Sequence, residues 1–329
     1  MISEALIDQT LSRFPRFERA QIAIRPLEKG GSDRKYYRIQ VGCGDSLILV
    51  KYGDQRDENR HYVSIARFLD REGIRVPRIY FHDEGEGLIW MEDLGESDLW
   101  EHSDEPWPQR RALYFSTLDQ AALLHAPAHL APAQAGLELQ KEFNAELYVW
   151  EQYYFFENCL GRFFKTDPAA VAAHRDSSAL EKIAARLAAL PRVLVHRDFQ
   201  SQNVMVKNGA AYLIDFQGLR PGLAQYDLAS LIYDPYIALT AGQRAELLDY
   251  YIAKSVGAGG DVPAEFREIY DLCAMQRLMQ ALGAYGFLGL VKGRADFLQH
   301  IPAALASLRE VVARIPEMEP LASLLASLP

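Results

Sequence analysis

Cysteine is scarce in this sequence: only Cys43, Cys159 and Cys273 occur among 329 residues. Their number is odd and they lie far apart in the chain, so neither a disulfide framework nor a zinc cluster is indicated. We therefore expect the protein to work in a reducing compartment, and the cytoplasm is the simplest one.

An excess of positive charge is also lacking. Lys and Arg number 35 against 44 Asp and Glu, which gives a formal net charge of −9. A nucleic acid or an anionic membrane would require a basic surface, so neither is expected as a partner. No apolar run approaches the length of a membrane span, and residues 1–14 lack the basic start and apolar core of a signal peptide. Nothing in the sequence indicates a protein partner.

A charged loop between two short apolar runs is the most informative segment. The apolar runs cover residues 193–195 and 204–206, and the loop between them reads His196-Arg197-Asp198-Phe199-Gln200-Ser201-Gln202-Asn203. The Asn-Gly pair at 208–209 is typical of a tight hairpin turn, from which a second strand returns to Asp215. The loop and the hairpin together place three polar side chains, those of Asp198, Asn203 and Asp215, in one region.

Asn203 and Asp215 fall almost symmetrically about the hairpin turn. Facing residues of an antiparallel pair have Cβ atoms roughly 5 Å apart, so one amide oxygen and one carboxylate could share a cation. Mg²⁺ needs only one or two protein oxygens when phosphates and water supply the rest. Asp198 has no ligand partner of its own, and we expect it to accept the proton of a substrate hydroxyl, as in the pattern H-R-D-x-x-x-x-N.

Upstream segments have the pattern of a nucleotide-binding lobe. An apolar run over 46–50 predicts a buried strand that ends at Lys51, a lysine placed to contact the α and β phosphates of ATP. A helix is predicted from Glu58 to Leu69, and Glu58 could pair with Lys51, although Asp57 and Glu72 compete for that role. Residues 29, 34, 35, 38 and 51 supply the local positive charge that an ATP site needs.

Two further segments complete this nucleotide site. The loop with Gly30, Gly31, Ser32 and Arg34 can approach phosphates closely, because glycine has no Cβ atom. A strand over 88–91 runs into the linker 92–95, where backbone groups of Glu92 and Leu94 could hydrogen-bond adenine. The rest of the chain is predicted to be mainly helical, with helices at 110–125, 142–160, 179–190 and 303–315.

These residues resemble the aminoglycoside phosphotransferase and choline kinase superfamily, whose members share the protein-kinase fold and phosphorylate small molecules. The motifs at 30–38, 91–95, 214–217, 226–231 and 280–286 are similar to bacterial anomeric kinases of cell-wall amino sugars. Those enzymes phosphorylate the C1 hydroxyl of N-acetylmuramate and N-acetylglucosamine in peptidoglycan recycling. One departure is Gly218, where that group often has a further acidic residue.

The resemblance implies an α+β, two-lobed fold with a small antiparallel-sheet lobe and a larger, mainly helical lobe. Residues 1–95 would form the nucleotide-binding lobe and 96–329 the catalytic and substrate-binding lobe. The resemblance also implies ATP and Mg²⁺ as cofactors and a small sugar as substrate. The implied roles are a catalytic base at Asp198, metal ligands at Asn203 and Asp215, phosphate positioning by Lys51 with Glu58, and structural support from His196 and Asp227.

Two assignments in the second lobe stay open. Asp227 precedes the apolar run 228–232, so it could cap that helix and brace the catalytic loop, or be a plain N-cap. The segment 142–160 is rich in aromatic residues, which are usually core but also stack on sugars. Helices after the linker form one wall of the acceptor pocket in the superfamily, so the substrate-contact candidates are Trp150, Glu151, Tyr154 and Glu157.

Three other functions are weighed against this one. A protein kinase is disfavoured, because no Ala-Pro-Glu follows Asp215. A pseudokinase or scaffold would bind nucleotide without chemistry, yet the expected catalytic and metal-binding residues are all present. An aminoglycoside or choline kinase would need an acidic acceptor pocket for a cationic substrate, which the overall acidity permits.

Overall fold

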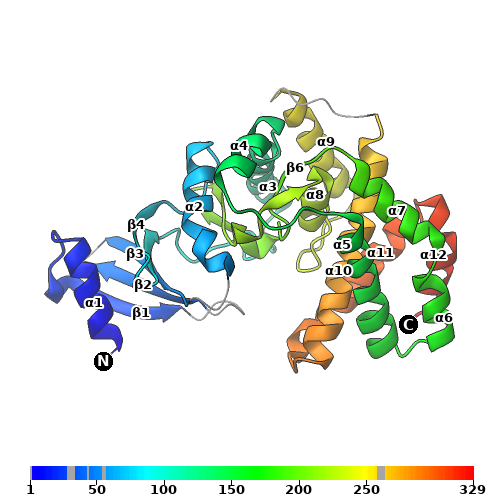
Figure 1. Cartoon of the computed structure of the whole chain (residues 1–329), viewed down its shortest axis with the longest axis horizontal. Helices are drawn as coiled ribbons and strands as arrows, with labels where there is room; N and C mark the ends of the chain where they lie inside the picture. Colours follow the sequence, from blue (N-terminus) through cyan, green and yellow to red (C-terminus); the bar gives the residue numbers. More distant parts are fainter. Residues whose placement is uncertain (1, 28–33, 43, 54–56, 258–263) are drawn as a thin grey trace.

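A computed structural model describes residues 2–27, 34–42, 44–53, 57–257 and 264–329. Figure 1 shows an elongated molecule with a β-sheet near one end and most of the helices toward the other. The sheet is five-stranded and antiparallel, with strand order β1-β2-β3-β5-β4. Its strands are β1 (Ile22–Leu27), β2 (Lys35–Val41), β3 (Asp45–Lys51), β4 (Ile79–Asp83) and β5 (Leu88–Glu92), accompanied by α1 (Ile2–Arg13) and α2 (Asp57–Arg71).

The two central strands of this sheet, β3 and β5, are buried on both faces. Leu49 and Trp90 belong to a small apolar cluster with Leu6 of α1, while Ile48 and Ile89, one residue removed, belong to the main core. Because successive strand residues point to opposite faces, a strand covered on both sides needs a continuous apolar run. The buried strand predicted over 46–50 is therefore confirmed.

The remainder of the chain is mainly helical and follows a linker after β5. Its helices are α3 (Trp107–Leu124), α4 (Leu130–Gly136), α5 (Ala145–Phe155), α6 (Pro168–Arg175), α7 (Ser178–Ala189), α8 (Ala224–Ile232), α9 (Ala241–Gly257), α10 (Phe266–Leu290), α11 (Ile301–Val312) and α12 (Glu319–Ala326). Two short antiparallel pairs lie among them: β6 (Val193–Val195) with β9 (Arg220–Gly222), and β7 (Val204–Lys207) with β8 (Ala210–Leu213). The predicted α+β composition is confirmed, and the division at residue 95 stays a prediction.

The helix predicted over 142–160 changes its geometry part of the way along. The α-helix α5 ends at Phe155 and continues as a π-helix over Phe156–Phe163. This segment packs against α10, where a Cβ atom on Gly286 would lie 2.3 Å from the carbonyl oxygen of Asn158. Only glycine permits that approach, so the glycines in the motif 280–286 serve helix packing.

The sheet and the helical part share one hydrophobic core. Tyr62 of α2 stacks on Phe216, which follows β8, with ring centroids 4.8 Å apart. Arg75 links the same regions: its carbonyl oxygen accepts from Leu213 N at 2.8 Å, and its Nε donates to the carbonyl oxygen of Ala211 at 2.8 Å. The β7–β8 hairpin is thereby held against the first lobe.

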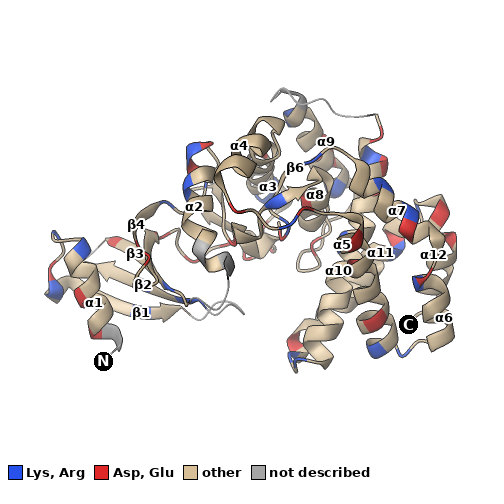
Figure 2. Ribbon diagram, in the orientation of Figure 1, with Lys and Arg blue, Asp and Glu red and all other residues tan. Residues whose placement is uncertain are grey.

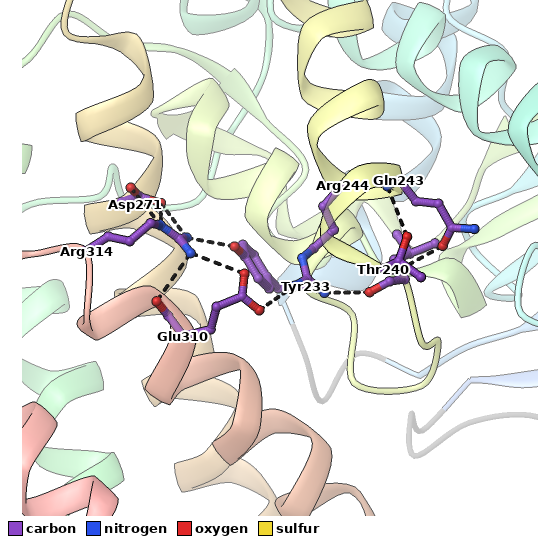
Figure 3. A network of polar contacts seen from close by, with 8 residues as sticks. Tyr233, Thr240, Gln243, Arg244, Asp271, Glu310 and Arg314 are labelled. Atoms are coloured by element: carbon purple, nitrogen blue, oxygen red, sulfur yellow. Dashed lines mark hydrogen bonds and ion pairs between the residues drawn. The ribbon is translucent and has the colours of Figure 1, made fainter.

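A polar network joins the C-terminal helices to the segment after α8 (Figure 3). Arg314, just after α11, donates to Tyr233 Oη at 2.8 Å and to Asp271 Oδ1 of α10 at 2.7 Å. Arg244 of α9 forms an ion pair with Glu310 of α11. Four segments that are distant in sequence are thus tied together beside Tyr233.

Charges of both signs are interspersed over the described chain (Figure 2). Within the described ranges, no helix combines the length and the apolar character needed to cross a membrane.

Candidate active site

Asp198 lies in the loop between β6 and β7, where its side chain is 34% exposed. Arg197 Nη1 is 3.3 Å from Asp198 Oδ2. Burial alone would raise the pKa of this carboxyl, but the charges of Arg197 and Arg277 and other nearby cations hold the pKa below its ordinary value. The group is therefore ionised at neutral pH and able to accept a hydrogen bond from a hydroxyl.

The start of this loop is held by Asp227 of α8, whose carboxylate is fully buried. Asp227 Oδ2 accepts from His196 N at 2.6 Å, and Oδ1 accepts from Arg197 N at 2.8 Å. His125 Nε2 is 3.1 Å from the same Oδ2. Arg197 has φ of 78°, a left-handed conformation that is costly for a residue with a Cβ atom, and the bonds from Asp227 fix the backbone around it.

The predicted N-cap role of Asp227 is wrong. Helix α8 begins at Ala224, and Asp227 lies inside its first turn. From there its side chain points to the loop backbone, not to the helix end. The structure does contain the other predicted feature, the hydrogen bonds by which Asp227 braces the catalytic loop.

The other end of the loop is held by a second carboxylate from the same region. Asp234 Oδ2 accepts from Ser201 N at 2.8 Å and from Ser201 Oγ at 2.6 Å, and its Oδ1 accepts from Tyr236 N at 3.1 Å. Asp234 lies one residue after Tyr233 of the network in Figure 3. Helix α8 and the residues that follow it therefore hold the catalytic loop at both ends.

Asn203 and Asp215 lie at the open end of the β7–β8 hairpin. Asn203 Nδ2 donates to the carbonyl oxygen of Asp198 at 2.8 Å, and no described residue donates to its Oδ1. Asp215 Oδ1 accepts from Gln217 Nε2 at 2.6 Å, and no described residue donates to its Oδ2. One amide oxygen and one carboxylate oxygen thus remain available, which is a donor set that suits Mg²⁺.

The predicted pairing of these two residues is wrong by one position. The hairpin register places Val204 opposite Leu213, and Ile214 N donates to the carbonyl oxygen of Asn203 at 3.0 Å. Asp215 lies one residue beyond and turns out of the strand with φ of 60°. His196 Nε2 is 2.9 Å from the carbonyl oxygen of Ile214, so it ties the catalytic loop to this turn. Among the described residues, no group of three or more His, Cys, Asp or Glu could hold a metal ion.

The expected phosphate-binding residues are only partly described. Lys51 ends β3 and is exposed, whereas Gly30, Gly31 and Ser32 lie outside the described residues. Glu58 lies in the first turn of α2, and its side chain is likewise not described. Arg34 is buried, and its Nη1 donates to Gln217 Oε1 at 3.4 Å. Since Gln217 also binds Asp215, Arg34 connects the glycine-containing segment with the expected metal ligand.

Not all of the predicted positive charge is available to a nucleotide. Arg38 is buried, and its Nε lies 2.7 Å from Asp93 Oδ2 in the linker. It also forms an ion pair with Glu96. The expectation that Arg38 adds free charge to an ATP site is therefore wrong, because its charge is neutralised by the linker.

The strand end and linker expected to contact adenine are tied to the hairpin. Lys207 Nζ donates to Glu92 Oε1 at 2.7 Å and to the carbonyl oxygen of Asp93 at 3.0 Å. The amide of Glu92 donates to the carbonyl oxygen of Arg78 at 2.8 Å. No hydrogen bond between described residues uses the backbone of the buried Leu94. Leu94 therefore keeps the backbone groups that an adenine ring would require.

The four substrate-contact candidates do not form one cluster. Trp150 is 48% exposed and stacks on Tyr154 with ring centroids 4.9 Å apart. Glu157 is exposed and pairs with Arg162 at 2.7 Å. Glu151 instead is fully buried, and its Oε1 accepts from Tyr226 Oη at 2.7 Å. Burial raises the pKa of Glu151 to about 7, although Tyr226 and nearby arginines lower it.

Several residues around the loop have no predicted role at the site. His125, Asp234, Arg220 and Arg277 are all buried polar residues. Each lies in or beside an apolar segment, and a charged residue in such a segment is the only signal that could have indicated them. Arg277, for example, stands between Gln276 and Leu278 in the largely buried helix α10.

Comparisons with known proteins agree with this geometry. The chain is 27% identical to the N-acetylmuramate/N-acetylglucosamine kinase of Pseudomonas aeruginosa over 314 residues, which cover 92% of this chain and 88% of that protein. It is 26% identical to the kinase of the same name from Neisseria meningitidis over 300 residues, which cover 90% of this chain and 87% of that protein.

Solved structures show the same fold at lower identity. A choline kinase from Cryptosporidium parvum superposes with a TM-score of 0.64 at 14% identity, over 99% of this chain and 100% of that one. An aminoglycoside phosphotransferase with bound ADP gives a TM-score of 0.60 at 15% identity, over 93% and 98%. The predicted two-lobed, protein-kinase-like fold is confirmed. Residues 23–269 match the phosphotransferase enzyme family, and since this range is most of the chain, the protein belongs to that family.

Proposed function

We propose that this phosphotransferase transfers the γ-phosphoryl group of ATP to the C1 hydroxyl of N-acetylmuramate or N-acetylglucosamine. The observation that carries the proposal is the loop of Asp198: an ionised, partly exposed carboxylate fixed beside Asn203. A carboxylate in this position can orient a sugar hydroxyl and accept its proton. The names of the relatives supply the choice of sugar.

The other residues would position the donor. Lys51, with Glu58 and the segment of Gly30, Gly31, Ser32 and Arg34, would hold the phosphates, and backbone groups of Glu92 and Leu94 would be the contacts to adenine. Asn203 and Asp215 would hold Mg²⁺, which when bound neutralises charge on the phosphates. Most of the rate enhancement would then come from positioning and electrostatic stabilisation.

The test is Mg²⁺-dependent ADP release from ATP over a panel of acceptors. The panel contains N-acetylmuramate, N-acetylglucosamine, other hexoses, choline and an aminoglycoside. Asp198→Asn is the inactive variant, and Asp104→Asn, which changes an exposed carboxylate, is the matched control. We expect turnover with the amino sugars only, and an acid-labile sugar 1-phosphate as the product.

The alternatives give different results in the same assay. Turnover of choline or an aminoglycoside without turnover of the sugars would favour the cationic acceptors. ATP binding with no acceptor turned over would favour a nucleotide-binding scaffold. A phosphorylated sugar that resists mild acid would overturn the choice of the C1 hydroxyl alone.

A further inference from the structure

Three arginines from different elements lie around Asp198. Arg197 belongs to the catalytic loop, Arg220 begins β9, and Arg277 lies in the middle of α10. Arg220 stands opposite Val195, three residues before Asp198, in the β6–β9 pair, and Arg277 donates to Ser230, which lies one turn after Asp227 on α8. The charges of the three arginines also lower the pKa of Asp198. Both buried arginines therefore lie beside the elements that hold the loop of Asp198.

Arg220 is buried and forms no ion pair with a residue that the structure describes. It is 9% exposed, its Nε donates to the carbonyl oxygen of Gly218 at 3.1 Å, and its guanidinium lies over the Phe143 ring at 5.4 Å. Within the described chain its two terminal nitrogens donate to no atom. Neither of these two nitrogens is sealed from solvent, so both can still contact water.

Arg277 is likewise a buried arginine. Burial alone would lower its pKa, but nearby groups that include Tyr226 and Asp198 hold the pKa above its ordinary value. It is 5% exposed, its Nε donates to Ser230 Oγ at 3.0 Å, and its Nη1 donates to Gln280. No described carboxylate forms an ion pair with it, and Nη2 has no described acceptor. A buried cation normally has an anionic partner, because removing the charge from water costs several kcal/mol. Two such cations near the same loop indicate a partner that comes from outside the chain.

The carboxylates nearby do not fill this role. Asp198 is 3.3 Å from Arg197, and neither it nor Glu151 pairs with Arg220 or Arg277. Glu151 is hydrogen-bonded to Tyr226, while its Oε2 is sealed from solvent without a partner. Burial and the charge of Arg197 lower the pKa of Arg220 to about 10, so it stays charged at neutral pH.

We propose that Arg220 and Arg277 form a subsite for a carboxylate of the acceptor, beside Asp198. A guanidinium binds a carboxylate through parallel N–H donors, and the pair is strongest where water is excluded. Resting on the proposed function, the inference selects one substrate class: a sugar with a carboxylate substituent, as in N-acetylmuramate, is preferred over its neutral counterpart N-acetylglucosamine. Cationic acceptors would be repelled by the same two residues.

The test compares three acceptors that differ in one group: N-acetylmuramate, its carboxamide analogue, and N-acetylglucosamine. We expect Arg220→Gln and Arg277→Gln each to lower kcat/KM for N-acetylmuramate by about 10- to 100-fold, as for the loss of a hydrogen bond to a charged group. The values for the two neutral acceptors should change by less than about threefold. Arg220→Lys keeps the charge without the planar donors, so its kcat/KM for N-acetylmuramate should lie between those of the wild type and Arg220→Gln. Arg267→Gln, an exposed residue of the same helix, is the control.

Equal losses on all three acceptors would overturn the subsite and indicate that the arginines act on the phosphoryl group or on folding. The subsite would also be overturned if the wild-type enzyme had the same kcat/KM for the carboxamide analogue and for N-acetylmuramate. Calorimetric binding of N-acetylmuramate to the ADP complex separates this inference from the proposed function. If N-acetylmuramate binds more weakly to Arg220→Gln and the wild type shows no turnover, the proposed function is wrong and the subsite stands. If N-acetylmuramate does not bind, or binds equally to the variant and the wild type, the subsite is wrong.

Discussion

Two sets of buried polar groups flank Asp198, and they differ in how well they are paired. On one side, Asp227 and Asp234 each receive at least three hydrogen bonds or close contacts from the loop and its neighbours. On the other side, Arg220 and Arg277 have terminal nitrogens without a described acceptor. The paired groups stabilise the loop, whereas the unpaired ones are a cost to folding that a bound ligand would offset.

The largest effect is expected where both sets meet, at Asp198. Asp198→Asn removes the proton acceptor while keeping the shape, so kcat should fall by about 10²- to 10⁴-fold. ATP affinity should stay within about threefold, measured by calorimetry. Lost ATP affinity with residual turnover would contradict the assignment of Asp198 as the base.

A substitution on the paired side should cost stability. Asp227→Asn leaves one of the two loop N–H groups facing an NH₂ group and removes the buried charge opposite His125. We expect the free energy of unfolding to fall by about 3 to 5 kcal/mol, the usual range for breaking a buried charged contact. Urea unfolding measures this, with Asp249→Asn, an exposed carboxylate, as control. A loss below about 1 kcal/mol would mean that Asp227 does not hold the loop.

Glu151, whose Oε2 has no described partner, should make the free energy of unfolding depend on pH. Burial raises its pKa from 4.5 to about 7, so between these values the unfolded chain has lost a proton that the folded chain keeps. The contribution of Glu151 to the free energy of unfolding therefore falls as pH rises from about 4.5 to 7, and it stays constant above pH 7. Glu151→Gln removes this dependence and should be more stable than wild type above pH 7, by up to about 3 kcal/mol.

Urea unfolding of wild type and Glu151→Gln at pH 4.5, 6 and 8 provides the measurement, with Glu146→Gln of the same helix as control. A difference between wild type and Glu151→Gln that does not change with pH would contradict the raised pKa.

The smallest effect is expected in the network of Figure 3. Arg314 is 38% exposed, and its partner Asp271 is 23% exposed, so solvent screens their ion pair. Arg314→Gln should lower the free energy of unfolding by less than about 1 kcal/mol and leave kcat unchanged. A large fall in kcat would show that the network transmits strain through Tyr233 to Asp234 and the loop.

The catalytic loop could be predicted from sequence because its pattern is local. Asp198, Asn203 and Asp215 lie within 18 residues, and the apolar runs around them define the strands. The supports come from elsewhere in the chain: the contact between His125 and Asp227 spans 102 residues. No local pattern encodes a contact of that kind, so these residues appear only in the structure.

Other misses have equally specific causes. The predicted pairing of Asn203 with Asp215 is wrong by one residue, because the two-residue turn at 208–209 places Asn203 opposite Ile214. Asp215 follows in a left-handed conformation, which the alternation of a strand does not reveal. Arg38 was expected to serve a nucleotide because its charge was visible in the sequence. Its partner Asp93, in the linker, was visible too, but their proximity depends on how β2 lies against β5 through β3.

The most direct test of the difference between the two sides is the free energy of unfolding of Arg220→Gln without substrates, measured beside Asp227→Asn. We predict that Arg220→Gln is at least as stable as the wild type, because it removes a buried charge that has no ion-pair partner among the described residues, while N-acetylmuramate binding weakens. If Arg220→Gln is instead destabilised as much as Asp227→Asn, Arg220 belongs to the scaffold, and the distinction between paired and unpaired groups fails.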